Sequence, residues 1–130
     1  MSSLGIGSVI QEILLSSVPV TDKVNDRIFP VLAQEDTEYP FVVYQRSGMK
    51  PAYTKDRYSV EDTLYVNVAI ISEKYVESLE IAECVLKSLE RKKGTFAGLK
   101  ITDIRLADSS ENGEDVFIQG LSFEITINNE

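Results

Sequence analysis

Residues 60–93 hold, without interruption, the two hydrophobic periodicities that most restrict what this chain can fold into. In Val60–Ser72 every second residue of the central part is apolar, which is typical of a strand with one buried face. A strand followed closely by a long helix predicts a sheet with a helix packed on it. The strand residues predicted to face the core are Leu64, Val66, Val68 and Ile70.

The stretch Tyr75–Lys92 predicts the principal helix, because its apolar residues recur at spacings of three and four. Ser72 is a suitable N-cap, and Glu73 would place a negative charge near the positive end of the helix dipole. Arg91-Lys92-Lys93 would place positive charge at the other end, and Gly94 is the expected stop. The predicted apolar stripe is Val76, Leu79, Ala82, Val85, Leu86 and Leu89.

The N-terminal third predicts a helical entry followed by two strands. Ser3–Ser16 has one apolar stripe, which is typical of an amphipathic helix, and Val20–Asn25 would add one more turn. Ile28–Val31 predicts a short edge strand, because Pro30 cannot donate to a ladder. Phe41–Ser47 predicts a second strand that is apolar on both faces, as in a strand covered on both sides or one within an assembly.

Two further strands are predicted at the C-terminal end, Leu99–Ala107 and Val116–Asn128. The parity of the apolar residues changes near Thr102-Asp103, which predicts a bulge. The connection Asp108–Asp115 contains an Asn-Gly pair, which is typical of a tight hairpin turn. Gly120 lies opposite the apolar face of the last strand and marks either a bulge or a close backbone approach.

The predicted order of elements is α-β-β-β-α-β-β, in a single domain of residues 1–130. The strand-helix-strand unit is a crossover, expected to be right-handed, and the flanking strand pairs are hairpins. We expect an α+β fold, a two-layer sandwich in which helices pack on one face of a mixed, mostly antiparallel sheet. Neither a membrane span nor a secretion signal is expected, because no run of about 18 apolar residues occurs and the N-terminus lacks a positive start.

The residue types present argue against most kinds of catalysis. The chain has no histidine and a single cysteine, Cys84, so it holds neither a Ser-His-Asp triad nor a Cys-His pair. It contains no nucleotide-binding loop and no nucleophile elbow. Its paired carboxylates are sequence neighbours that point to different sides, and the acids of Asp108–Asp115 lack the EF-hand spacing. We therefore expect no enzyme, no metal, no cofactor and a packing role for Cys84.

The segment Gly48–Ser59 is locally basic and carries tyrosines, in a chain whose net charge is −8. It is a solvated hairpin loop, a protein–protein contact or a nucleic-acid contact; tyrosine and arginine are favoured interface anchors. The acidity elsewhere either keeps the protein soluble or lines a path that nucleic acid must pass without sticking. The candidate residues for contact with another subunit or a tube are Lys50, Tyr53, Lys55, Arg57 and Tyr58.

Several motifs follow one another in a recognisable order. Arg27-Ile28-Phe29-Pro30 precedes a loop and then Pro40-Phe41-Val42-Val43-Tyr44, and the long strand contains Tyr65-Val66-Asn67-Val68-Ala69-Ile70. This order resembles the tail completion, or tail terminator, proteins of the head–tail joining region of tailed phages, with their R-I-F/Y-P, P-Y/F-V-V-Y and V-x-V-x-V-A strands. The chain departs from the family at Ala33-Gln34, where many relatives have proline before glutamine.

The resemblance implies a structural, non-enzymatic role in the virion of a phage or prophage. Such proteins form rings, commonly hexamers, at the head-proximal end of the tail tube, where they stop tube growth and provide the surface on which the filled head docks. The implied partners are further copies of the chain, the tail tube protein and a head-completion or connector protein, with DNA only as passing cargo. Assembly would take place in the host cytoplasm.

An alternative from a different class is a small ligand-binding or regulatory α+β domain of a bacterial host. Such a domain requires a sizeable apolar pocket with a few polar groups. A ligand-dependent rise in melting temperature would favour this alternative.

Overall fold

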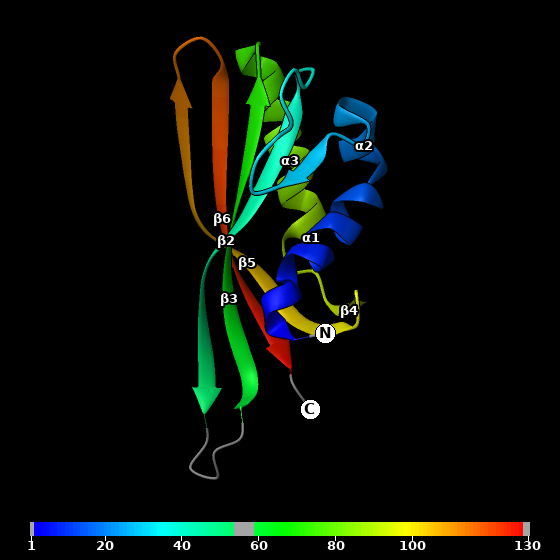
Figure 1. The fold of residues 1–130 in the computed structure, drawn as a ribbon, viewed down its shortest axis with the longest axis vertical. Coiled ribbons are helices and arrows are strands. Elements are labelled where there is room, and N and C mark those ends of the chain that lie inside the picture. The colour runs from blue at the N-terminus through cyan, green and yellow to red at the C-terminus, as the bar shows by residue number, and fades with distance from the viewer. Residues whose placement is uncertain (1, 54–58, 129–130) are drawn as a thin grey trace.

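Strand β3 (Ser59–Ser72) lies near the centre of a six-stranded sheet, between β2 and β6 (Figure 1). The structure is a computed structural model and describes residues 2–53 and 59–128. The strand order in the sheet is β1-β2-β3-β6-β5-β4. The elements in chain order are a 3-10 turn (Ser3–Gly5), α1 (Ile6–Leu15), α2 (Val18–Val24), β1 (Ile28–Pro30), β2 (Phe41–Tyr53), β3, α3 (Tyr75–Leu89), β4 (Gly94–Phe96), β5 (Leu99–Gly113) and β6 (Phe117–Asn128).

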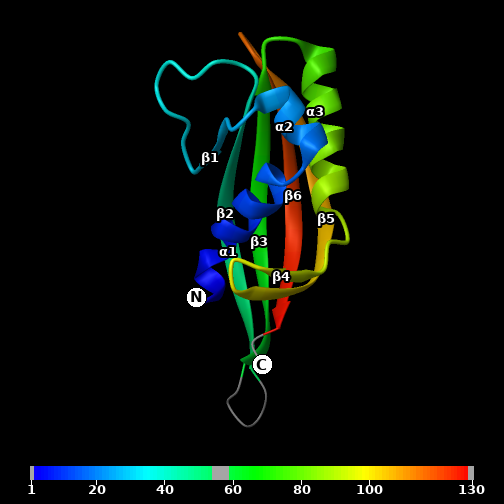
Figure 2. The same cartoon turned by 90° about the vertical axis from the view of Figure 1, so that its right-hand side faces the viewer.

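The sheet is mixed but mostly antiparallel, since β1 and β2 run parallel and the other four pairings are antiparallel. It twists strongly and curls into a half-barrel, and α1, α2 and α3 lie on one of its faces (Figures 1 and 2). The predicted hairpins are β2–β3 and β5–β6. The predicted crossover through α3 joins β3 to β5, which run in the same direction with β6 between them. The α+β class is therefore confirmed.

The hydrophobic core lies between the helices and the sheet. The four core residues predicted from the alternation of β3 are all buried. β6 contributes Phe123, Ile125 and Ile127 beside them, and Cys84 of α3 packs against this cluster half-buried. The fully buried residues of α1 are Ile6, Val9, Ile10 and Leu14.

The predicted order of elements was incomplete. The turn expected at Val20–Asn25 is a separate helix, α2, and β4 adds a strand at the far edge of the sheet. The sheet is curled into a half-barrel, and the two-layer sandwich that we expected is not confirmed. β4 is short and exposed at Gly94 and Thr95, so it offers no apolar alternation from which a strand is predicted.

Both hairpins are longer than predicted. β2 continues to Tyr53 through a segment expected to be a loop, and β5 continues to Gly113 through the expected connection. Main-chain ladders hold these extensions, with Lys50 opposite Thr63 and Asn112 opposite Ile118. The side chains of 107–113 are exposed, so the burial signal on which a strand prediction depends is missing there.

The buried stripe of α3 differs from the predicted one. Val76 and Leu79 are 63% and 36% exposed, whereas Ser78 and Ile81 are fully buried. The stripe continues back from Ala82, Val85 and Leu89 through Ile81 to Ser78. Ser78 is tolerated in the core because its hydroxyl donates to the Tyr75 carbonyl oxygen at 2.6 Å.

The predicted ends of α3 were also wrong in detail. Lys74 is the N-cap residue, and the acid in the first turn is Glu77 instead of Glu73. Ser72 precedes the N-cap residue and stabilises the entry to the helix. Its Oγ accepts a hydrogen bond from the Lys74 amide at 3.1 Å and donates one to Glu77 at 2.7 Å. The helix ends at Leu89, before Arg91 adopts a positive φ of 62°, and Gly94 lies in β4.

One local prediction in the C-terminal hairpin is confirmed. The register of β5 against β6 shifts between Ile101 and Asp103, which is the predicted bulge. Gly120, predicted to mark a bulge or a close backbone approach, pairs in regular register with Ser110, and a Cβ there would lie 2.7 Å from the Ser110 Oγ, so the close approach is that of a side chain.

None of the described helices is by itself long and apolar enough to cross a membrane. The two helical segments Ser3–Leu15 and Val18–Val24 reach the required length and composition only when they are taken together, and the chain bends by 89° between them. Their buried side chains belong to the core described above.

Candidate assembly surfaces

The described part of the predicted basic segment lies in the last residues of β2 and the first residue of β3, and these two strands extend to one end of the molecule (Figure 1). Lys50 is exposed on β2, beyond the register shift between Arg46 and Gly48. Tyr53 is the last residue of β2 and pairs with Ser59. The remaining candidates, Lys55, Arg57 and Tyr58, lie outside the described residues, so their role stays a prediction.

The β5–β6 hairpin extends toward the opposite end and is acidic (Figure 1). Residues 108–116 include four acids and no base, and all four acids are exposed. The Tyr75 ring of α3 packs edge-on against Phe117, with ring centroids 5.6 Å apart. The Tyr75 hydroxyl donates to Glu111 Oε2 at 3.0 Å, and this hydrogen bond and the charge of Glu111 raise the pKa of Tyr75.

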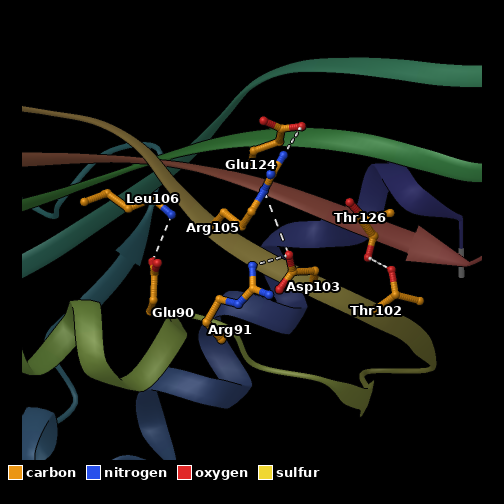
Figure 3. A network of polar contacts seen from close by, with 8 residues as sticks. All are labelled: Glu90, Arg91, Thr102, Asp103, Arg105, Leu106, Glu124 and Thr126. Atoms are coloured by element: carbon orange, nitrogen blue, oxygen red, sulfur yellow. Dashed lines mark hydrogen bonds and ion pairs between the residues drawn. The ribbon is translucent and has the colours of Figure 1, made fainter.

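The C-terminal end of α3 covers part of the open edge of β5 (Figure 3). The Leu106 amide donates to Glu90 Oε2 at 2.9 Å, and the Arg91 amide donates to the Ile104 carbonyl oxygen at 2.6 Å. The Arg91 guanidinium also contacts Asp103 at 2.9 Å. These contacts satisfy edge groups that would otherwise offer a template for another strand.

A hollow of about 350 Å³ lies beside the opposite edge strand, β1. We call it the edge hollow; its residues are Leu4, Gly7, Pro30, Val31, Tyr44, Gln45 and Arg46, with Leu32 following Val31. Leu4, Val31 and Leu32 are 61%, 62% and 80% exposed. A group of exposed aliphatic residues at a concave surface is typical of a contact surface.

Val31 adopts an unusual backbone conformation in this hollow. Its φ is 66°, a left-handed value that costs a residue other than glycine about 1–3 kcal/mol. The conformation is held by the Val31 amide donating to the Tyr44 carbonyl oxygen at 2.7 Å and the Leu32 amide donating to that of Pro30 at 2.6 Å. This site was not predicted from the sequence, because neither valine nor leucine, the residue types at positions 31 and 32, is typical of a left-handed turn.

The outer face of α3 is a second exposed apolar surface, which we call the α3 ridge and define as Val76, Leu79 and Glu83. Val76 and Leu79 are the two residues wrongly predicted to be core. Glu83 follows Leu79 by four residues, so it lies on the same face of the helix. The β1 edge and α3 lie on opposite flanks of the molecule (Figure 2).

The described residues contain no group of three or more Cys, Asp or Glu side chains placed to hold a metal ion. Burial raises the pKa of Tyr44, whose hydroxyl donates to Gln11 Oε1 at 2.7 Å, so this tyrosine ties α1 to β2. The hollows found on the described surface measure about 220–420 Å³ and are open to the surface.

Comparison with known proteins finds similarity in structure only. No model of a known protein family matches the chain, and no curated protein matches it in sequence. A chain from the virion of a native gene transfer agent particle superposes with a TM-score of 0.78 at 10% identity, over 98% of this chain and 100% of that one. The gp17 protein of bacteriophage SPP1 superposes with a TM-score of 0.59 at 23% identity, over 98% and 91%. The protein therefore shares its whole fold with these two chains.

Proposed function

We propose that the protein is a structural component of the tail of a phage or phage-like particle. The observation that carries this proposal is the end-to-end match to a chain of a gene transfer agent virion. The match to a second protein, from bacteriophage SPP1, supports it independently. The motif order in the sequence supports the same class, since it resembles the tail completion proteins.

Within the tail, we propose that the protein forms a ring at the head-proximal end of the tube. The ring ends tube growth, joins the tail to the head and lets DNA pass. Two features support this. The net charge of −8 disfavours tight binding to the phosphate backbone. The exposed aliphatic surfaces of the β1 edge and α3 suit a protein that assembles.

The proposed role is not enzymatic. The absence of histidine removes the commonest general acid–base group. The single cysteine packs against the core, where a thiol behaves as a small apolar group.

The first test is the mass of the purified protein in solution, measured by light scattering across a wide concentration range, with negative-stain images of the heaviest species. A closed ring with a hole wide enough for duplex DNA supports the proposal. A second test adds the protein to polymerising tail tube protein from the same particle. Shortened tubes with the protein bound at one end are expected; tubes of unchanged length with bare ends would contradict the proposal.

The basic end of the β2–β3 hairpin provides a directed test. Replacing Lys55 and Arg57 together with glutamate should abolish assembly on the tube, because the hairpin end is predicted to reach a neighbouring subunit or the tube. Replacing Lys92 and Lys93 with glutamate is the matched control, since both are exposed and lie between α3 and β4, outside the β2–β3 hairpin. Unchanged circular dichroism would establish that the fold is intact, and unchanged capping by the first variant would refute this role.

A further inference from the structure

The edge hollow and the α3 ridge each combine exposed aliphatic side chains with one exposed charged side chain, and the two charges are opposite in sign. The lining of the hollow includes the aliphatic side chains of Leu4 and Val31 beside the polar Gln45 and Arg46, whereas the ridge is the outer face of a helix. Arg46 is exposed in the hollow, and Glu83 is exposed on the ridge. Neither forms an ion pair with any other residue that the structure describes. Two surfaces that each combine exposed apolar residues with one charge, of opposite sign on the two surfaces, have the composition expected of the two sides of a protein–protein interface.

The two surfaces are made of different residues, and β1 and α3, which carry them, lie on opposite flanks of one chain (Figure 2). A contact between them therefore cannot be a two-fold contact in which the same patch meets itself. It is a head-to-tail contact, which closes into a ring when the rotation between copies divides a full turn.

We propose that the α3 ridge of one copy docks into the edge hollow of the next copy. Val76 and Leu79 enter the hollow against Leu4, Val31 and Leu32, and Glu83 pairs with Arg46. This inference rests on the proposed function and names the surfaces that would join neighbouring subunits of the ring.

The strained turn at Val31 fits this docking. The left-handed φ directs the chain so that Val31 and Leu32 are both exposed beside the hollow, although β1 ends at Pro30. Strained backbone that persists in a fold is concentrated at binding surfaces. The hydrogen bonds to Tyr44 and Pro30 hold the turn in place before a neighbour arrives.

A mixing experiment tests the proposal. Leu32→Asp blocks the hollow and leaves the ridge intact, whereas Val76→Asp blocks the ridge and leaves the hollow intact. Both residues are more than 60% exposed, so neither change removes core packing. Val18→Asp is the matched control, since Val18 is an aliphatic residue with 65% exposure outside both surfaces. Masses are measured by sedimentation or light scattering.

The wild type and Val18→Asp are expected to assemble over the same concentration range. Each blocking variant should need at least about tenfold higher concentration, the cost of 1.4 kcal/mol. An equimolar mixture of the two blocking variants should form a dimer and stop there, because the dimer uses the one intact ridge and the one intact hollow and leaves only the two blocked faces. A mixture that stays monomeric, or blocking variants that assemble like the wild type, would overturn the proposal.

A charge exchange gives an independent check. Arg46→Glu should weaken assembly, and the double variant Arg46→Glu/Glu83→Arg should restore it. Failure of the double variant to recover would overturn the Arg46–Glu83 pairing. Wild-type protein that remains monomeric up to millimolar concentration would overturn the whole inference, whereas the tail role itself is decided separately by the tube-capping test.

Discussion

The β2–β3 and β5–β6 hairpins extend toward opposite ends of the molecule and carry opposite charge (Figure 1). Residues 46–58 include four basic side chains and one acid, whereas residues 108–116 include four acids and no base. Both hairpins are long ladders of main-chain hydrogen bonds with polar side chains near their ends. Their architecture is therefore shared, and the side chains decide what each end can contact.

The hairpins also differ in how they are tied to the helical layer. In β3, the buried Asp62 carboxylate accepts a hydrogen bond of 2.6 Å from Ser3 in the N-terminal turn. In β6, the buried Gln119 side chain donates to Ser78 of α3 at 3.3 Å and to Glu111 at 3.1 Å. The tie of β3 to the helical layer is made by a carboxylate, whereas β6 reaches α3 through the neutral Ser78 hydroxyl, which predicts different costs when each tie is broken.

The largest effect is expected from breaking the charged tie. Asp62→Ala should lower the free energy of unfolding by about 1.5–3 kcal/mol, the usual range for a hydrogen bond to a charged group. The Ser3 hydroxyl and the Asp62 carboxylate are both buried, so the hydrogen bond between them is shielded from water. Urea denaturation of the wild type and the variant measures the difference.

Glu61 is the natural control for Asp62, since it is the preceding acid of the same strand and is exposed. Glu61→Ala should change stability by no more than about 0.5 kcal/mol. If Glu61→Ala and Asp62→Ala lowered the free energy of unfolding equally, the charge of the strand would account for the effect and the buried Asp62–Ser3 hydrogen bond would not.

The glycines of the two hairpins should respond in opposite directions. A Cβ on Gly120 would meet Ser110 Oγ at 2.7 Å, so Gly120→Ala should destabilise by about 1–3 kcal/mol. A Cβ on Gly48 would lie 3.6 Å from the Tyr65 ring, an ordinary contact. Gly48→Ala should therefore stabilise by about 0.4–1 kcal/mol, because it restricts the unfolded chain. Thermal and urea unfolding of both variants measure the contrast.

A double substitution isolates the cause of the Gly120 effect. Ser110→Ala removes the Oγ that a Cβ at position 120 would meet, and Ser110 is exposed, so the single change should be nearly neutral. The double variant Gly120→Ala/Ser110→Ala should recover most of the stability lost by Gly120→Ala. No recovery would place the strain in the backbone and not in the Ser110 side chain.

The sequence predicted those parts of the fold whose side chains have one consistent buried face. The alternation in β3 located its core residues, and the spacing in α1 located its buried stripe. In α3 two overlapping stripes are compatible with the spacing, one through Val76 and Leu79 and one through Ser78 and Ile81. The second is the buried one, because the Ser78 hydroxyl finds partners in Tyr75 and Gln119, which are not evident from the sequence.

The candidate surfaces were less predictable. Lys50 was predicted as a contact residue from its type and is exposed on a strand, but its function is still a prediction. The edge hollow depends on the left-handed backbone of Val31 and on residues from α1, β1 and β2 meeting in space. No local sequence pattern predicts that these residues lie close together, since their proximity results from tertiary packing.

The neutral tie of β6 should be weaker than the charged tie of β3. Gln119→Leu removes both donated hydrogen bonds, but the Ser78 hydroxyl still donates to the Tyr75 carbonyl oxygen. The expected loss is at most about 1 kcal/mol, since no buried donor is left unpaired. Gln119→Glu is nearly isosteric and places a second carboxylate beside Glu111, so it should cost more. A larger loss for the leucine variant would contradict this account.

The smallest expected effect concerns Tyr75, whose hydrogen bond to Glu111 raises its pKa above 10.0. Glu111→Gln removes the charge, so the Tyr75 pKa should fall toward 10.0, measured by the absorbance of the phenolate during titration. A pKa that is higher in the folded state adds stability that is present below the unfolded pKa and lost as the pH rises through the folded pKa. The alkaline decline in stability should therefore be smaller in Glu111→Gln. Tyr44 serves as the reference, because burial raises its pKa and Glu111 does not.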